Sequence, residues 1–206
     1  MIHEAEVFQL ADEAAVQAFA LVGPDDMDSV LPPVFDMPGA DRPVPLRQVL
    51  AHAAYDEAWI PDMLAGRTMD EVGRDAYDGD LLGTDPHAAV ARIAERARAA
   101  AARVTDRDAV VHCSYGDVPM WDYFWQLNVA RALTAHDVAQ LLGTESPLSE
   151  ELAREMWKGT APSADMWRSF GVYRAEVPVP DGASWRTRYL GLTGRPDEAL
   201  RRSGAC

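Results

Sequence analysis

Residues 120–142 read MWDYFWQLNVARALTAHDVAQLL, and this stretch combines helical periodicity with polar residues in apolar surroundings. At about 100° per residue, one face of the predicted helix is centred on Leu127, and we expect this face to point into a core. It carries Met120, Tyr123, Phe124, Ala130, Arg131, Thr134, Val138 and Leu141. The opposite side carries Trp125, Val129, Leu133 and His136. The helix is therefore apolar nearly all round, and we expect both faces to be covered.

Arg131 and Thr134 are the polar residues on the face that we expect to be inward. A threonine inside a helix commonly bonds to its own backbone, which explains Thr134 without a function. A guanidinium on a core face costs several kcal/mol unless a carboxylate or a ligand pairs with it. Arg131 therefore predicts either a structural ion pair, for which Asp56 is the candidate partner, or an anion-binding site.

A second helix is predicted from about Pro45 to Leu64, because proline is tolerated in the first turn of a helix. Its apolar stripe consists of Leu46, Val49, Leu50, Ala53, Ile60 and Leu64. Asp56 falls inside this stripe, and His52 and Trp59 fall along one of its edges. The sequence thus predicts a histidine and a carboxylate on one core-facing side of the helix.

Further helices are predicted over residues 4–22, over residues 86–102 behind an Asp85-Pro86 cap, and after a similar Ser146-Pro147 start. Residues 23–45 and 65–85 are rich in Gly, Pro and Asp and predict long loops. The expected fold is all-α, a four-helix bundle with long crossover loops, an additional C-terminal helix and a wrapped extended tail. We expect a single domain over residues 1–206, with the bundle in residues 1–170 and the tail in residues 171–206.

Composition narrows the classes of function. The chain has 206 residues and a formal charge of −14, which argues against a nucleic-acid partner because phosphate binding needs clustered Lys and Arg. No apolar run approaches the roughly 20 residues of a membrane span, and the acidic N-terminus is unlike a signal peptide, so we expect a cytoplasmic protein with no membrane partner.

Cys113 and Cys206 form no metal-binding pattern. His112 precedes Cys113, but neighbours on an extended segment point to opposite faces.

Several segments together resemble the DinB-like superfamily. They are the helix over residues 46–64 with His52, then AGRTMDEVG (65–73), DGDLLGTDP (78–86), VHCSYGDVP (111–119), LTAHDVAQLLG (133–143) and the tail VPVPDGASWRTRYLGLTGRP (177–196). Within the superfamily they are most similar to the actinobacterial branch of mycothiol-dependent maleylpyruvate isomerase-like, metal-binding proteins. The resemblance implies a four-helix bundle whose cavity holds a divalent metal, zinc or nickel. It also implies mycothiol as a cofactor.

In the family, the metal ligands are one histidine of the second helix and an acid-x-x-x-His pair on the fourth. His52 matches the first of these ligands. Alignment of LTAHDVA with the family's His-x-x-Asp pattern places Asp137 on the acid of that pattern, Thr134 on the ligand histidine and Ala130 on the ligand acid. His136 lies about 180° from the inward face, so it does not replace the missing histidine, and we interpret it as a surface residue. The resemblance therefore predicts a degenerate metal site.

These residues support three hypotheses of function. In the first, the metal cavity has become an organic one: Arg131 anchors a carboxylate or enolate, His52 and Asp56 transfer protons, and Trp59, Tyr123, Thr134 and Asp137 bind the substrate. The reaction would be of an isomerase, thiol transferase or cyclase-like type, for example in secondary metabolism. The second hypothesis is a non-catalytic ligand-binding protein. The third is a metal-dependent mycothiol S-transferase or isomerase with unusual ligands, such as His52, Asp56 and Asp137. In each case we expect a small-molecule ligand and a monomer or homodimer.

Overall fold

The computed structural model describes residues 1–195 and residue 197, which are mostly helical with a few short strands. The chain packs as two compact units. The first unit consists of residues 1–30 and 44–147, and the second of residues 31–43 together with the described residues from 148 onward. The second unit thus begins before the tail that the sequence predicts from residue 171. The expected single domain over residues 1–206 stays a prediction.

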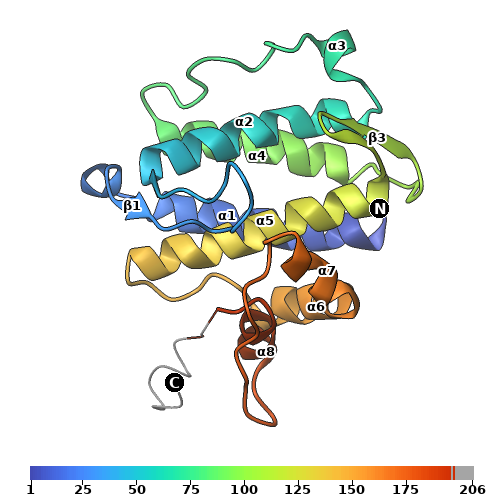
Figure 1. Cartoon of the computed structure of the whole chain (residues 1–206). Coiled ribbons are helices and arrows are strands. Elements are labelled where there is room, and N and C mark those ends of the chain that lie inside the picture. The colour runs from blue at the N-terminus through green and yellow to red at the C-terminus, as the bar shows by residue number, and fades with distance from the viewer. Residues whose placement is uncertain (196, 198–206) are drawn as a thin grey trace. The chain divides into compact units, whose positions relative to one another are not determined.

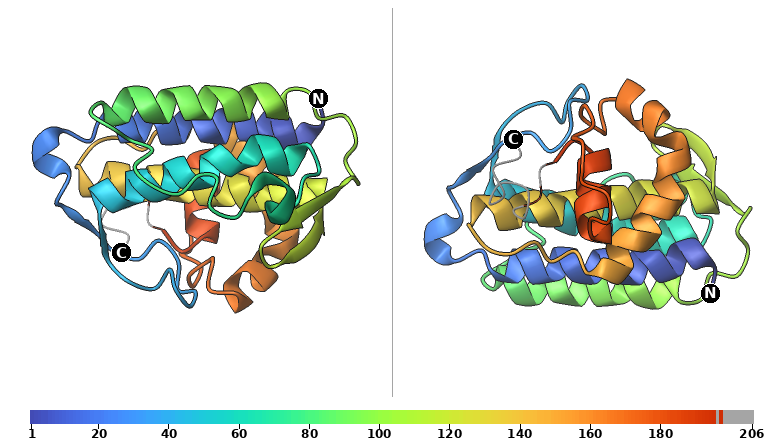
Figure 2. Two further views of the ribbon diagram at one scale, coloured as in Figure 1. Left: turned by 90° about the horizontal axis from the view of Figure 1, so that it is seen from above. Right: turned by 90° about the horizontal axis from the view of Figure 1, so that it is seen from below.

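Four long helices build the first unit: α1 (His3–Ala20), α2 (Leu46–Leu64), α4 (Pro86–Ala101) and α5 (Met120–Leu141). They run side by side, as Figures 1 and 2 show from three directions. α1 packs along both α5 and α4, and α4 packs along α2. Alanines on α1 and α4, among them Ala11, Ala15, Ala94 and Ala97, are buried and allow these helices to approach closely. The mostly helical fold predicted from the sequence is confirmed at this level.

Shorter elements connect these helices. The first unit also contains the 3-10 helix η1 (Pro24–Asp26), the helix α3 (Met69–Val72), and the hairpin of β3 (Val110–Cys113) with β4 (Gly116–Pro119). The hairpin is antiparallel, leads directly into α5, and pairs His112 with Asp117. Two-residue strands β1 (Val30–Leu31) and β2 (Val44–Pro45) precede α2. Within the described residues, no helix is both long enough and apolar enough to cross a membrane.

Side-chain caps determine where several helices begin. The predicted start of α4 is confirmed, because the Asp85 carboxylate accepts a hydrogen bond from the Ala88 N–H at 3.1 Å and Pro86 occupies the first helical position. The predicted start at Ser146-Pro147 is wrong. The next helix, α6 (Glu150–Thr160), begins three residues later, where the Ser149 hydroxyl accepts from the Leu152 N–H. Two serines in close succession offered two possible caps, and the second one is used.

The second unit contains α6, the 3-10 helix η2 (Ala161–Ser163), α7 (Ala164–Ser169) and α8 (Trp185–Leu192). α6 packs against α8, and Trp157 and Trp185 contact each other with ring centroids 5.6 Å apart. The segment between α7 and α8 contains no helix or strand, as the sequence predicts, and its Arg174 donates a hydrogen bond to the Pro33 carbonyl at 2.6 Å. Predictions that fall on Cys206 lie outside the described residues.

We expect Gly194→Ala to destabilise the second unit more than Gly182→Ala does. Both glycines have φ of +77°, where an alanine costs roughly 1–2 kcal/mol. At Gly194 the added Cβ would also lie 2.5 Å from the Ala175 carbonyl oxygen, whereas at Gly182 it would meet nothing within 4 Å. The steric conflict should add about 1–3 kcal/mol. Urea unfolding of the two variants measures the difference, and equal losses would contradict this account.

Candidate functional site

The burial of α5 confirms that both of its faces are covered. Phe124, Val129 and Leu133 are all buried, although they lie on different sides of the helix. The centre of the inward face is nevertheless predicted wrongly. The strip around Leu127, which continues through Ala130, Thr134 and Asp137, is only half-buried, and Leu141 is exposed. Because α5 is apolar nearly all round, its periodicity gives no clear direction to the core.

His136 is a second correction on α5. Its position opposite Leu127 suggested that it would lie at the surface, but it is only 2% exposed. Its Nδ1 lies 3.0 Å from the Ser146 hydroxyl oxygen. His136 therefore belongs to the buried back of α5, which the sequence predicted to be covered without indicating that the histidine would be covered too.

Arg131 is buried and pairs with Glu57 of α2. Its Nε donates a hydrogen bond to Glu57 Oε2 at 2.7 Å, and its Nη2 lies 2.5 Å from the same oxygen. The two side chains are 7% and 6% exposed. The prediction that Arg131 needs a carboxylate is confirmed, but the residue is Glu57 and not Asp56. Asp56 falls on the apolar stripe predicted for α2, but the adjacent residue, Glu57, is the buried one.

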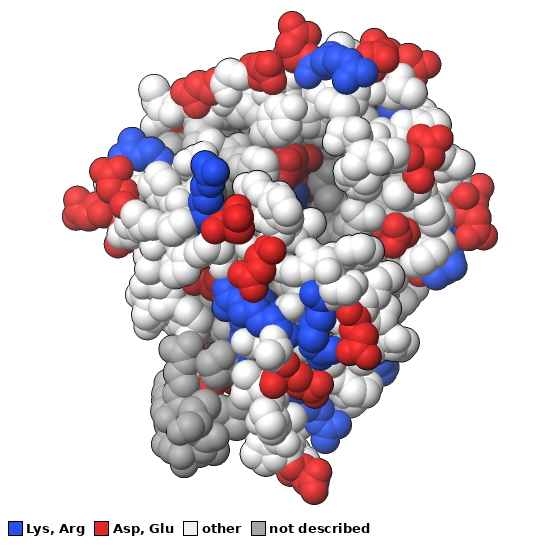
Figure 3. Space-filling model, in the orientation of Figure 1, with Lys and Arg blue, Asp and Glu red and all other residues white. Residues whose placement is uncertain are grey.

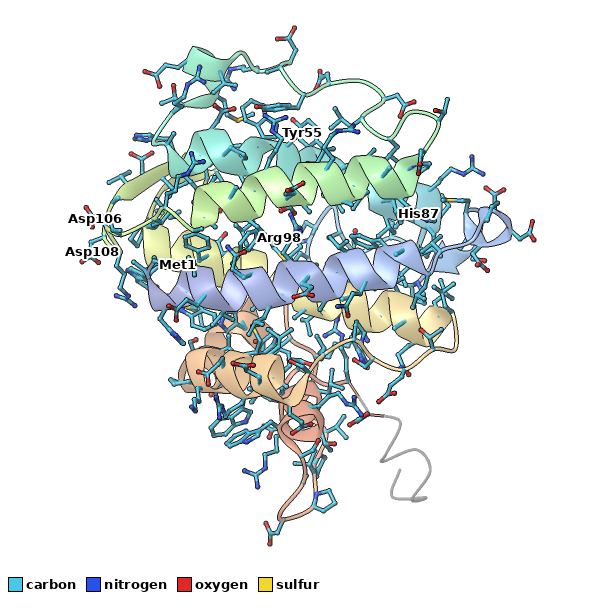
Figure 4. All side chains as sticks on the ribbon, turned by 180° about the vertical axis from the view of Figure 1, so that it is seen from behind. Met1, Tyr55, His87, Arg98, Asp106 and Asp108 are labelled. Carbon is cyan, nitrogen blue, oxygen red and sulfur yellow. The ribbon has the colours of Figure 1, made fainter. Side chains whose placement is uncertain are left out.

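Two further charges extend this pair across the unit. Glu57 is within hydrogen-bonding reach of the Asp12 carboxylate of α1. Asp12 in turn accepts a hydrogen bond from Arg98 Nη1 of α4 at 2.6 Å. In the view from behind, Arg98 lies between α4 and α1 (Figure 4). Each long helix thus contributes one charged side chain to a chain of contacts, Arg98–Asp12–Glu57–Arg131, which we call the buried charge network.

Glu57 is the member of this network whose proton affinity is most altered. Burial raises its pKa to about 8; the Arg131 charge opposes this shift, and the Asp12 charge adds to it. Among the described residues, no group donates a hydrogen bond to Glu57 Oε1. A carboxylic acid with this pKa keeps its proton at neutral pH. Glu57 can then donate a hydrogen bond to Asp12 while it accepts one from Arg131.

A small cavity of about 10 Å³ adjoins the buried charge network. Asp12, Glu57 and Arg131 form its polar wall. Ala15, Phe19, Ala54, Val90 and Ala94 are among its apolar lining residues. This volume has room for about one water molecule, so it is too small for a substrate. A substrate that uses Arg131 must approach from outside the helix interior.

His52 and Asp56 lie close together, but not in the core. His52 Nε2 is 3.4 Å from Asp56 Oδ2, as expected for residues four apart on a helix. Their side chains are 75% and 44% exposed, so the prediction that they face the core is wrong. Their ion pair is with each other, whereas Arg131 pairs with Glu57. Asp56 is still near enough to Arg131 for its negative charge to help raise the pKa of the guanidinium against the opposing effect of burial.

The face of the first unit that carries α2 and α5 is hollowed. Figure 3 shows this hollow between the two helices, with acidic and basic atoms at its floor. Trp59 of α2 and Tyr123 of α5, two of the predicted substrate-binding residues, are buried in one hydrophobic cluster with Phe124. Trp59 packs edge-on against Tyr77, with ring centroids 4.9 Å apart. The indole Nε1 of Trp59 has no hydrogen-bond acceptor among the described residues.

The residues present do not fit the metal site of the family. Ala130 and Thr134 supply no ligand for zinc or nickel, which prefer His, Cys and carboxylate groups. Within residues 1–195 and 197, no three His, Cys, Asp or Glu side chains gather closely enough to hold an ion. This also applies to the alternative ligand set of His52, Asp56 and Asp137. We therefore derive no chemical step through a metal.

The hairpin before α5 does not form a cysteine–histidine nucleophile. His112 Nδ1 lies 2.8 Å from Asp117 Oδ1, whereas the Cys113 thiol interacts with Tyr115. Burial raises the pKa of Cys113, which disfavours the reactive thiolate. The two side chains therefore have separate surroundings, as their adjacent positions on an extended strand predict.

No model of a known protein family matches this chain, and neither the curated proteins nor the solved structures that were compared include a match. The class of protein therefore follows from its own geometry. It is a mostly helical protein in which four long helices bury Arg131 and two carboxyl groups beside a small cavity, with the partly exposed Arg98 paired to one of these carboxyl groups.

Proposed function

We propose that this chain is a DinB-like four-helix bundle protein that acts as an enzyme on a small organic molecule. The substrate would bind in the hollow between α2 and α5, and the reaction would be of the isomerase, thiol transferase or cyclase-like type. The observation that carries the proposal is the buried Arg131 of α5, which Glu57 of α2 holds by a hydrogen bond. A fixed guanidinium in a dry site stabilises a carboxylate or enolate far better than it does in water.

In this proposal the His52–Asp56 pair transfers the proton. An imidazole can accept and donate a proton at neutral pH, and a carboxylate orients its ring. The pair lies on the accessible side of α2, so a substrate can reach it without unfolding the core. The half-buried strip of Ala130, Thr134 and Asp137 supplies small and polar groups on α5 to shape the hollow.

The family resemblance supports the same region as the site. The positions of the three family metal ligands correspond to His52, Ala130 and Thr134, which lie on α2 and on the half-buried strip of α5. Loss of two ligands removes the metal without filling the hollow with large side chains. A thiol transferase reaction would draw its thiol from mycothiol, whose role here rests on the resemblance.

A non-catalytic ligand-binding protein is the second candidate. The exposure of His52 favours it, because general acid–base groups usually work in sites that exclude water. A binding protein would use Arg131 and the hollow and would not need the His52–Asp56 pair. The two candidates therefore predict different results for a His52 variant. An enzyme would lose its activity, whereas a binding protein would keep its affinity for the ligand.

We expect His52→Ala to lower proton exchange at a carbon next to a carbonyl group by about 10²-fold or more. Maleylpyruvate, pyruvate and oxaloacetate would each be incubated with the protein in heavy water, with and without a thiol, and deuterium uptake would be followed by NMR. His3→Ala is the matched control, because His3 pairs with Glu6 at 3.9 Å on α1, away from α2. Binding without exchange, or exchange unchanged in His52→Ala, would favour the binding protein over the enzyme.

A further inference from the structure

The contact between Asp12 and Glu57 requires a proton. Both side chains are buried, and they come within hydrogen-bonding reach of each other at the small cavity that they both line. Two ionised carboxylates have only acceptor atoms and repel each other in such a place. With one proton between them, the same contact becomes a hydrogen bond from an acid to a carboxylate, which is a strong type of bond.

The partners of the two carboxyl groups decide which one carries the proton. Asp12 accepts a hydrogen bond from Arg98 at 2.6 Å, so it already has a charged donor. Glu57 uses Oε2 to accept from Arg131, and its Oε1 receives no hydrogen bond among the described residues. The proton therefore belongs on Glu57, which can donate it to Asp12.

The location of this proton changes the charge of the whole network. Facing Glu57 are Arg131 from α5, Asp12 from α1 with Arg98 of α4 behind it, and the adjacent Asp56 on α2 itself. Tyr123 is near, but burial raises its pKa and keeps it neutral. The positive charge of Arg98 and the negative charge of Asp12 balance each other. With Glu57 protonated, Arg131 is left with a positive charge that its own hydrogen-bond acceptor does not cancel.

We propose that Asp12 and Glu57 share one proton, and that this proton makes the first unit a proton-coupled binding site for a small organic anion. The anion, a carboxylate or an enolate, compensates the charge of Arg131 as long as Glu57 is uncharged. When Glu57 loses its proton, it compensates Arg131 itself, and the anion is released. The location of the anion in the hollow rests on the proposed function, whereas the shared proton rests only on the contacts of Asp12 and Glu57.

Two amide substitutions identify the protonated group. In Glu57→Gln the amide oxygen can accept from Arg131 and the amide N–H can donate to Asp12, so we expect little change in melting temperature at about pH 6. Asp12→Asn should lower the melting temperature clearly, because it leaves Arg98 without its carboxylate. A large loss in Glu57→Gln, similar to that in Asp12→Asn, would overturn the shared proton.

A direct readout of the proton comes from infrared spectroscopy. The wild-type protein at neutral pH should show the carbonyl band of a protonated carboxylic acid, and Glu57→Gln should remove it. Glu4→Gln is the matched control, because Glu4 is another buried glutamate beside an arginine, with Arg107 at 2.7 Å. The band should remain in this control. A spectrum without the band, or a band that survives Glu57→Gln, would overturn the shared proton.

Calorimetric titration with maleylpyruvate tests the coupling to anions. Above about pH 8 the affinity of the wild-type protein should fall by about tenfold per pH unit, and the affinity of Glu57→Gln should stay constant. Affinity that is independent of pH in both proteins, or no binding to a protein that shows the infrared band, would overturn the coupling. If only the His52 test fails, the infrared band and the pH-dependent affinity remain to be observed. The proposed enzyme function and the shared proton can therefore be disproved separately.

Discussion

The free energy of unfolding is expected to fall as the pH rises from about 5 to about 8. The pKa of Glu57 is raised from 4.5 to about 8 in the folded chain, so within this window the folded state holds a proton that the unfolded state has lost. Stability then decreases by up to about 1.4 kcal/mol per pH unit. The contribution of Glu57 is complete below its unfolded pKa and is lost as the pH passes through its folded pKa.

Urea unfolding at a series of pH values, performed on the wild-type chain and on Glu57→Gln, measures this effect. The chain also contains five histidines, which are present in both proteins. The difference between the two proteins isolates Glu57, because the histidines are common to both. We expect this difference to change by several kcal/mol over the window. Parallel curves for the two proteins would show that Glu57 is already ionised at neutral pH.

The sequence predicts Arg131 better than it predicts the partner of Arg131. An arginine among buried residues of a helix has to find a carboxylate, and this requirement holds whatever the details of packing. The choice between Asp56 and Glu57 depends on how α2 is rotated about its axis, and adjacent helical residues differ by about 100°. A signal for Glu57 was present, since Ala53, Ile60 and Leu64 of the predicted stripe are spaced so that residue 57 completes their series.

Asp12 and Arg98 could not be predicted as members of the site. Each is one of several charged residues on an alanine-rich helix, where charges are normally solvated. Phe8 and Phe19 on the same side of α1 are buried and show in retrospect that Asp12 faces inward. The contact of Asp12 with Glu57 depends on how closely α1 and α2 approach around the small cavity, which is a property of the assembled helices.

The exposure of His52 has a similar explanation. The apolar stripe of α2 runs from Leu46 to Leu64, and His52 lies at its edge, where a small rotation decides between core and solvent. By contrast, the cap at Asp85-Pro86 was predicted correctly, because it depends on residues that are adjacent in sequence. Local signals of this kind do not depend on helix packing, whereas the candidate site depends on it almost entirely.

Glu57→Leu is expected to be far more damaging than Arg131→Met. Removal of Glu57 takes away two hydrogen bonds to charged groups, one from Arg131 and one to Asp12, which contribute about 1.5–3 kcal/mol each. Removal of Arg131 leaves a Glu57 that is already uncharged at neutral pH, so we expect the loss of a hydrogen bond to a charged group, about 1.5–3 kcal/mol. If Glu57 were ionised, the two losses would be similar, because each variant would then bury one unpaired charge.

The double variant Glu57→Leu/Arg131→Met completes the cycle. Both new side chains are apolar, and replacement of both partners of a buried hydrogen bond by apolar groups of similar shape is often nearly neutral. We therefore expect the double variant to recover part of the stability that Glu57→Leu loses, with an interaction energy of about 2–3 kcal/mol between the two sites in urea unfolding. The double variant should also lose the binding of organic anions.

A double variant that is folded and stable but no longer binds an anion would show that Glu57 and Arg131 serve binding and not the stability of the helices. If the double variant were as unstable as Glu57→Leu, the damage would come from the altered shape of the interior and not from an unpaired Arg131.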